Sequence, residues 1–171
     1  ASPELCIVFG GKEQNSSCVV LSVAWLPVDG VDKATLLLAA VPAHGIFAST
    51  GPDYTDPTTW SFVKGSDSPT NINRIELASG MRLWVTCAVG GVWSGTITGA
   101  SSSGWTIDWS VRRALAENEQ AFSGIAVRAG GKDVAVMTFT SNNNQSIYRS
   151  LDGGKTGFHK VNWTVHTSVP W

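Results

Sequence analysis

The sequence is poor in charged residues and has no long apolar run. Only 15% of its 171 residues are Asp, Glu, Lys or Arg, and the formal net charge is −1. This balance gives no general reason to expect nucleic acid or an anionic membrane as a partner. The longest apolar run covers residues 36–42, whereas a helix that crosses a bilayer needs about 20 apolar residues. Insertion into a membrane is therefore not expected.

Cysteine is scarce as well, and its number is odd: Cys6, Cys18 and Cys87. Cys6 and Cys18 flank a turn at residues 10–11 and could pair across a hairpin. Such a disulfide would indicate a compartment outside the cytosol. The alternative is that both are buried free thiols in strands. No two cysteines have the spacing of zinc ligands and the histidines do not cluster with them, so neither a metal nor another cofactor is expected.

Glycine and tryptophan, by contrast, are abundant, with 18 and 8 residues. Low charge together with many glycines, hydroxyl side chains and aromatic residues is typical of a globular all-β protein. By its length the chain is one domain, residues 1–171, which can bury about 70% of the surface of the unfolded chain.

A repeat is visible along the chain. Three apolar segments end in glycine, at residues 19–30, 72–80 and 122–131. Each is followed by a second apolar run, at residues 36–41, 83–88 and 134–139. Gly30, Gly80 and Gly130 are 50 residues apart. This spacing predicts three four-stranded units, about residues 18–65, 70–111 and 122–163, with terminal strands in 1–17 and 164–171.

Apolar and β-branched runs between turn residues define the expected strands. They are residues 19–26, 35–41, 45–49 and 59–63; 73–78, 82–88, 92–98 and 105–111; and 123–128, 133–140, 146–150 and 158–163. A short strand is also expected at residues 6–9. Residues 112–120 are the only stretch with helical character, and we expect a connecting loop there. Prolines and acids predict a long exposed loop at residues 50–58.

The most distinctive segment is a turn that follows the strand at residues 146–150. Gly153 and Gly154 supply backbone angles that other residues resist. Asp152 can fold back onto the turn amides, and Ser150 and Thr156 can close the same loop from either side. These residues predict a tight turn that is held by its own polar side chains.

This segment resembles the Asp-box of the BNR repeat family, which includes the sialidases and whose pattern is S-x-D-x-G-x-T-W. In that family the box is a hairpin between the two outer strands of a β-propeller blade. The resemblance implies that its polar and glycine positions are structural and lie at the blade periphery: Ser150, Asp152, Gly154 and Thr156. One position departs from the pattern, because Gly157 separates the threonine from Phe158, where the family has tryptophan directly after threonine.

Two upstream segments repeat the apolar–aromatic–small rhythm before the turn, at residues 46–49 and 92–95. An aromatic residue follows each of the three turns: Trp60, then Trp105 or Trp109, then Phe158. We therefore expect an all-β, β-propeller-type segment of about three four-stranded blades with Asp-box hairpins. Because three blades are too few to close a propeller, each end blade would leave an apolar face uncovered. Copies of the chain or other protein subunits are expected to complete it. The alternative is that the terminal segments 1–17 and 164–171 fold back over the open faces.

The expected function is a non-catalytic module that binds carbohydrate or protein as a structural subunit of an extracellular or viral assembly. The alternative is a fragment of a sialidase-like glycoside hydrolase with its catalytic residues on another chain. For such an enzyme the resemblance implies three arginines, a Tyr–Glu pair and an acidic Asp. Tyr54 and Tyr148 are the only tyrosines, and no catalytic residue is assigned.

Three glycosylation sequons, at Asn15, Asn144 and Asn162, agree with an extracellular or virion-surface location. The chain begins at Ala1, as after removal of a signal peptide or of an initiator methionine. If only an initiator methionine was removed, the alternative location is the cytoplasm.

Two charged residues in an otherwise apolar strand are candidate contact residues. Arg74 and Glu76 are two positions apart on one strand and therefore share a face. At the corresponding positions the sister units have alanine, glycine or leucine. Arg74 and Glu76 either form a local salt bridge or contact a polar ligand or partner at the propeller axis.

Aromatic side chains give a second set of candidates. Trp93 and Trp105 flank residues 99–104, and Tyr54 lies in the acidic loop that contains Asp53. Aromatic faces stack on the apolar faces of sugars, so these residues could bind glycans. The alternative is that they pack in the core between sheets.

Overall fold

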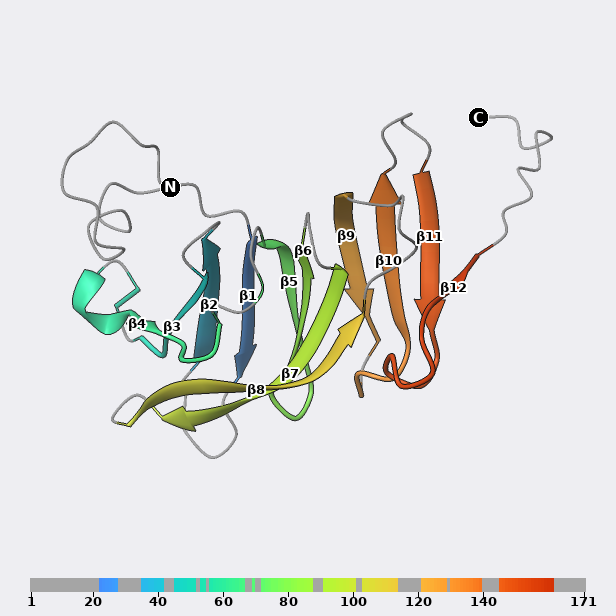
Figure 1. Cartoon of the computed structure of the whole chain (residues 1–171). Helices are drawn as coiled ribbons and strands as arrows, with labels where there is room; N and C mark the ends of the chain where they lie inside the picture. The colour runs from blue at the N-terminus through green and yellow to red at the C-terminus, as the bar shows by residue number, and fades with distance from the viewer. Residues whose placement is uncertain are drawn as a thin grey trace, which may run out of the picture.

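The computed structural model describes residues 22–27, 35–41, 45–51, 53–54, 56–66, 69, 72–87, 91–100, 103–113, 121–128, 130–139 and 145–161. Within these ranges the chain is nearly all β, and its one helix is a single 3-10 turn (Figure 1). The strand predicted at residues 6–9, the pairing of Cys6 with Cys18 and the tail at 164–171 lie outside the described residues.

The strands form three antiparallel sheets, each a meander of four consecutive strands. Sheet 1 consists of β1 (Ser22–Pro27), β2 (Thr35–Val41), β3 (Gly45–Ser49) and β4 (Ser61–Phe62), with the 3-10 turn η1 (Pro57–Thr59) before β4. Sheet 2 consists of β5 (Ile72–Ala78), β6 (Arg82–Cys87), β7 (Gly91–Ala100) and β8 (Gly104–Arg113). Sheet 3 consists of β9 (Ala121–Val127), β10 (Val134–Phe139), β11 (Gln145–Ser150) and β12 (His159–Lys160).

The predicted division into three four-stranded units is therefore found as three separate sheets. β2 and β3 have the predicted bounds, and most other strands differ by one or two residues at an end. Residues 112–113 correct the prediction of a loop at 112–120, because β8 continues to Arg113, which is paired with Val92. The rest of that stretch lies outside the described residues.

Sheets 1 and 2 pack face to face because alternate residues of their strands are apolar. Leu36, Leu38 and Ala40 of β2 point into this core together with Leu83 and Val85 of β6. The edges of the two sheets are also joined by backbone hydrogen bonds. The amide of Lys64 donates to the carbonyl of Trp105 over 2.9 Å, and the amide of Ile107 donates to the carbonyl of Lys64 over 2.9 Å.

Sheets 2 and 3 pack around Trp84, whose side chain is 0% exposed. Its ring meets Phe158 edge-on, with 6.3 Å between the ring centroids. On the other side the guanidinium of Arg82 lies 5.2 Å from the indole centroid, at a distance that gives a cation–π attraction. Arg82 Nε donates to Ser94 Oγ over 2.9 Å and its Nη2 donates to the carbonyl of Gly153 over 3.4 Å. One arginine therefore ties sheet 2 to the turn of sheet 3.

The far face of sheet 1, which points away from sheet 2, is covered by the chain itself. Ala39, Val41 and Phe47 on this face are 1%, 2% and 9% exposed. Tyr54 and Trp60 pack against them. We call the covering residues 53–54 and 56–60 the sheet-1 cap. The prediction of an open face at both ends is wrong for sheet 1, because Tyr54 of the loop at 50–58 and Trp60 just after it pack onto the sheet.

Cys87 is a buried free thiol at the end of β6. Burial raises the pKa of this thiol to about 12, so only about one molecule in ten thousand carries a thiolate here at pH 8. We expect Cys87 to resist iodoacetamide at pH 8 in the folded chain and to react rapidly in denaturant. Mass spectrometry of the peptide that contains Cys87 checks this. Complete labelling of the native chain within minutes would contradict the burial.

Candidate functional site

The candidate site is the face of sheet 3 that points away from sheet 2. Val134 and Val136 of β10 point inward and pack with Trp84, so the alternate residues of sheet 3 point outward. The strand register places Ala126, Ala135, Arg149 and His159 beside one another across the four strands. With them on this surface are Gly124, Arg128, Asp133, Met137, Ile147, Leu151 and Val161. We call this surface the sheet-3 outer face.

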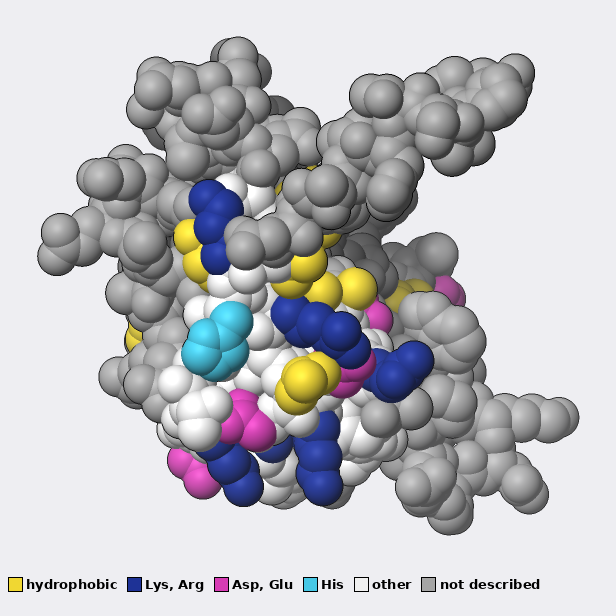
Figure 2. All heavy atoms as spheres, turned by 90° about the vertical axis from the view of Figure 1, so that its right-hand side faces the viewer, with side chains coloured by type: hydrophobic (Ala, Val, Ile, Leu, Met, Phe, Trp, Pro, Cys, Tyr) yellow, Lys and Arg dark blue, Asp and Glu magenta, His cyan; other side chains and the backbone are white. Residues whose placement is uncertain are grey.

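This face is open, unlike the far face of sheet 1. Leu151 is 67% exposed, and Ala126 is also exposed. Ala135 and Met137 are half-buried, although their neighbour Val136 on the inner side is 1% exposed. Figure 2, which looks onto the sheet-3 end of the molecule, shows Lys and Arg side chains gathered around hydrophobic ones. The surface thus combines apolar positions with a basic surround.

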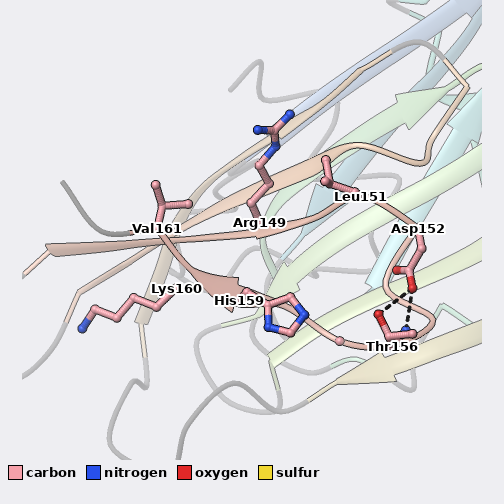
Figure 3. Close-up of a pocket in the computed structure, with 8 residues that line it drawn as sticks. Arg149, Leu151, Asp152, Thr156, His159, Lys160 and Val161 are labelled. Atoms are coloured by element: carbon pink, nitrogen blue, oxygen red, sulfur yellow. Dashed lines mark hydrogen bonds between the residues drawn. The ribbon is translucent and has the colours of Figure 1, made fainter.

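Two shallow hollows lie on either side of Arg149. One has a volume of about 360 Å³ and extends over β11, β12 and the turn between them (Figure 3). Its lining includes Leu151, His159 and Val161. The other has a volume of about 380 Å³ and lies over β9 and β10, where Ala126 and Ala135 contribute to its lining. Small side chains at these two positions leave room for a bulky group from outside.

An ion pair with Asp133 fixes Arg149, the side chain that separates the two hollows. Arg149 Nε and Nη2 donate to the two carboxylate oxygens of Asp133 over 2.8 and 2.6 Å. Arg128 Nη1 lies 3.8 Å from Asp133 Oδ2. The hydrogen bond from Arg149 holds the pKa of Asp133 below its usual value, and the same bond raises the pKa of Arg149. The acid is thereby engaged within the chain, and Arg128 extends outward with a side chain that is 78% exposed.

The turn after β11 has the hydrogen bonds that its residues predict. Ser150 Oγ donates to Asp152 Oδ1 and accepts from the amide of Gly154, both over 2.8 Å. Asp152 Oδ2 accepts from the hydroxyl and the amide of Thr156 over 2.6 and 2.9 Å, and Oδ1 accepts from the amide of Lys155 over 3.0 Å. The bond from the Thr156 hydroxyl, followed by that from Ser150, holds the pKa of Asp152 far below its usual value.

Glycines at three positions allow the backbone conformation of this turn. Gly153 and Gly154 have φ angles of 72° and 78°, which side-chain-bearing residues rarely adopt. Gly157, which interrupts the motif before Phe158, has a φ angle of 123°. Phe158 still reaches the core, where it packs with Trp84. Phe158 thus contacts the core although Gly157 separates it from Thr156.

The charges around this face are unbalanced. Residues 121–161 contain five cations against two acids, together with His159. The cations are Arg128, Lys132, Arg149, Lys155 and Lys160. Both acids, Asp133 and Asp152, are engaged by donors of the same sheet. A chain whose net charge is −1 thus has a locally basic end.

The predicted contact residues Arg74 and Glu76 lie on β5 and do not belong to the sheet-3 outer face. They pair with Thr86 and Trp84 of β6, so they lie on the face of sheet 2 that points toward sheet 3. Arg74 is exposed, and Glu76 is half-buried. Burial raises the pKa of Glu76. Their role in contacting a ligand or partner stays a prediction.

The predicted aromatic candidates lie apart from one another. Trp105 is 5% exposed and belongs to the core between sheets 1 and 2. Trp93 packs against the same core and meets Trp109 edge-on, with 5.6 Å between centroids. Tyr54 is half-buried in the sheet-1 cap, and its carbonyl accepts a hydrogen bond from Trp60 Nε1 over 3.0 Å. These positions favour the packing alternative, and glycan binding by these residues stays a prediction.

The sequence reasoning missed the sheet-3 outer face as a surface. The repeat contains a signal for this surface. In the second strand of each sheet, Ala135 of sheet 3 corresponds in register to Trp84 of sheet 2 and to Leu36 of sheet 1. The side chain at this position is large in sheets 1 and 2 and small in sheet 3. This difference indicates that the sheet-3 outer face lacks a large apolar side chain at its centre.

Two negative findings apply to the part of the chain that the structure describes. No three His, Cys, Asp or Glu side chains are grouped there as ligands of a metal ion. No helix in those ranges combines the length and apolar character that are needed to cross a membrane.

In the part of the chain that the structure describes, fold and surface together give three four-stranded antiparallel sheets with one open, basic end. No protein-family model matches the chain, and no curated protein matches it. A solved structure with similarity is PorZ, an essential surface component of the type-IX secretion system of Porphyromonas gingivalis, at 12% identity and a TM-score of 0.39. The alignment covers 91% of this chain and 22% of PorZ, so the chain spans about a fifth of that protein.

Proposed function

We propose that the chain is a non-catalytic assembly module, a propeller-type segment whose sheet-3 outer face docks onto another polypeptide. The observation that carries this proposal is the difference between the two ends of the stack. The far face of sheet 1 is covered by the sheet-1 cap, with Val41 only 2% exposed. The sheet-3 outer face has no comparable cover among the described residues, and Leu151 on its edge is 67% exposed.

Covering this face is favourable because sheets of this kind are stabilised by face-to-face packing. Each 100 Å² of apolar surface that a partner covers contributes about 2.5 kcal/mol before the entropic cost of association is subtracted. Ile147 and Met137 are half-buried on the open face, so a docked surface would complete their burial.

The interface between sheets 2 and 3 indicates what such a partner needs. There Trp84 of sheet 2 fills the centre of the contact, and Arg82 at the edge donates to a backbone carbonyl of the next sheet. On the sheet-3 outer face the central position is Ala135, and Arg149 lies beside it on β11. The partner would supply the bulky group, and the chain would supply the guanidinium groups.

A substitution at the centre of the face tests the proposal. We expect the purified chain to associate at micromolar concentration, and Ala135→Arg to reduce this association at least about tenfold, because it places a charge in the contact. Sedimentation velocity measures the association. Ser103→Arg, at an exposed residue just before β8, is the matched control and should associate like the wild type.

Methionine oxidation gives a second readout, since Met81 and Met137 are the two methionines of the chain. Oxidation of Met137 by peroxide should slow as the protein concentration rises, whereas Met81, which packs on the core between sheets 1 and 2, should be unaffected. A wild-type monomer of 18.1 kDa across this range, or an Ala135→Arg variant that associates normally, would contradict the proposed function.

A further inference from the structure

The described residues at the end opposite the sheet-3 outer face include acidic and aromatic side chains. In residues 45–63 the only charged side chains are Asp53 and Asp56. Asp53 is exposed and Phe62, on the neighbouring strand β4, is 39% exposed. The sheet-1 cap with Phe62 therefore presents carboxylates beside aromatic rings, and it lies at the far end of the stack from sheet 3 (Figure 1).

The sheet-1 cap is held in one conformation by its own hydrogen bonds. Thr59 Oγ1 donates to the carbonyls of Asp53 and Asp56 over 3.0 and 2.8 Å. Asp56 Oδ1 accepts from the amide and hydroxyl of Thr58 over 2.8 and 2.7 Å. Because the cap is already ordered, a partner that binds it would lose little conformational entropy on binding.

We propose that the sheet-3 outer face of one copy binds the sheet-1 cap of a second copy, head to tail. This inference rests on the proposed function and names the partner surface. Arg128 and Arg149 of one copy would meet the carboxylates of the other, beginning with Asp53. The hollow over Ala126 and Ala135 would receive an aromatic ring. The two surfaces are thus complementary in charge.

The same observations exclude other pairings of these surfaces. Two sheet-3 outer faces placed together would oppose arginine to arginine around Ala135, and juxtaposed like charges are unfavourable. The described residues of this face include cations but no Phe, Tyr or Trp side chain on which the bases of a nucleic acid could stack. The apolar lining of the hollows at Leu151, Val161 and Ala135 fits protein side chains better than a polyanionic backbone.

The geometry of the contact has a defined consequence. The two surfaces differ and lie at opposite ends of one chain, so the interface is heterologous. Repeating it either closes a ring or extends a filament, depending on the rotation between copies. A ring of two copies would contain six four-stranded sheets, because each chain supplies three.

A charge exchange between the two surfaces tests the inference. We expect Arg128→Glu and Asp53→Lys each to weaken self-association at least about tenfold in sedimentation velocity, because each substitution opposes like charges. In an equimolar mixture of the two variants, the new carboxylate of one meets the new ammonium group of the other, and the unchanged Arg128 and Asp53 meet at the next contact. The mixture should therefore associate within about threefold of the wild type.

Lys64→Glu and Asp108→Lys are matched controls, since both side chains are exposed and lie outside the two surfaces. Alone and mixed, they should associate like the wild type. A mixture of Arg128→Glu and Asp53→Lys that associates no better than either variant alone would overturn the inference. So would stronger association of Arg128→Glu alone, which would indicate contact between two sheet-3 outer faces. In both cases the proposed function would stand if Ala135→Arg still blocked association.

Discussion

Replacing Trp84 with alanine is expected to lower the free energy of unfolding by about 3–5 kcal/mol, as large-to-small substitutions of buried aromatic residues do. Trp84 is the largest of the fully buried side chains among the described residues. Its removal opens a cavity between sheets 2 and 3 and takes away the surface on which Arg82 and Phe158 pack. Denaturant unfolding, followed by circular dichroism, measures the loss.

Trp84→Phe separates packing from hydrogen bonding at this position, and Phe62→Ala is a surface control. Trp84 Nε1 is buried and has no hydrogen-bond partner among the described residues, so Trp84→Phe should cost less than half as much as alanine. Phe62→Ala, at a side chain that is 39% exposed, should cost about 1 kcal/mol or less. If Trp84→Ala were no more damaging than Phe62→Ala, sheets 2 and 3 would not be packed around this indole.

Asp152→Ala should have the next largest effect, through the turn that follows β11. The carboxylate accepts hydrogen bonds from both neighbours in the motif, Ser150 and Thr156, and from the amide of Lys155. Loss of these bonds leaves turn donors unpaired. We expect the thermal midpoint to fall by about 5–10 °C for a chain of this length. Differential scanning fluorimetry measures the change, and Asp108→Ala, at an exposed site on β8, should shift the midpoint by about 1 °C or less.

The same carboxylate makes stability depend on pH in a defined direction. The pKa of Asp152 is lower in the folded chain than its ordinary value of 3.8, so the folded state favours the ionised form. The stabilisation is complete above about pH 5 and is lost as the pH falls through 3.8 and below. Asp152→Ala should remove much of this acid sensitivity and retain the smaller part that comes from Asp133, whose pKa is also lowered. Loss of self-association at pH 7 with an unchanged thermal midpoint would contradict a structural role for the turn.

Local patterns in the sequence were sufficient to predict most strands and the hydrogen bonds of one turn. β2 and β3 have clear apolar runs between proline- or glycine-bearing turns, and their bounds were predicted to the residue. The hydrogen bonds of Asp152 follow from its position between Ser150 and Thr156. Both features depend only on residues close in sequence. The resemblance to the Asp-box family extends this to a propeller arrangement, which remains a proposal.

Contacts between segments that are distant in sequence could not be predicted from such local patterns. The acidic, proline-rich loop before Trp60 was predicted to be exposed. Tyr54 of this loop and Trp60 instead cover sheet 1, because an uncovered apolar face costs more than the ordering of a short loop. Arg82 was unremarkable in sequence, and its bond to Gly153 joins residues 71 positions apart. The sheet-3 outer face depends on which side of β10 turns toward Trp84, and strand alternation by itself does not determine that side.

The order of the sheets also bears on how the chain folds. Each sheet is a meander of consecutive strands, and the extensive contacts between sheets join sheet 1 to sheet 2 and sheet 2 to sheet 3. Because neighbouring segments form most of the structure, a first sheet can form by closing short loops, and the next can add to it as a template. Sheet 2 packs on both of its faces. We therefore expect its hydrogen bonds to be the last to open and unfolding to begin at the outer sheets.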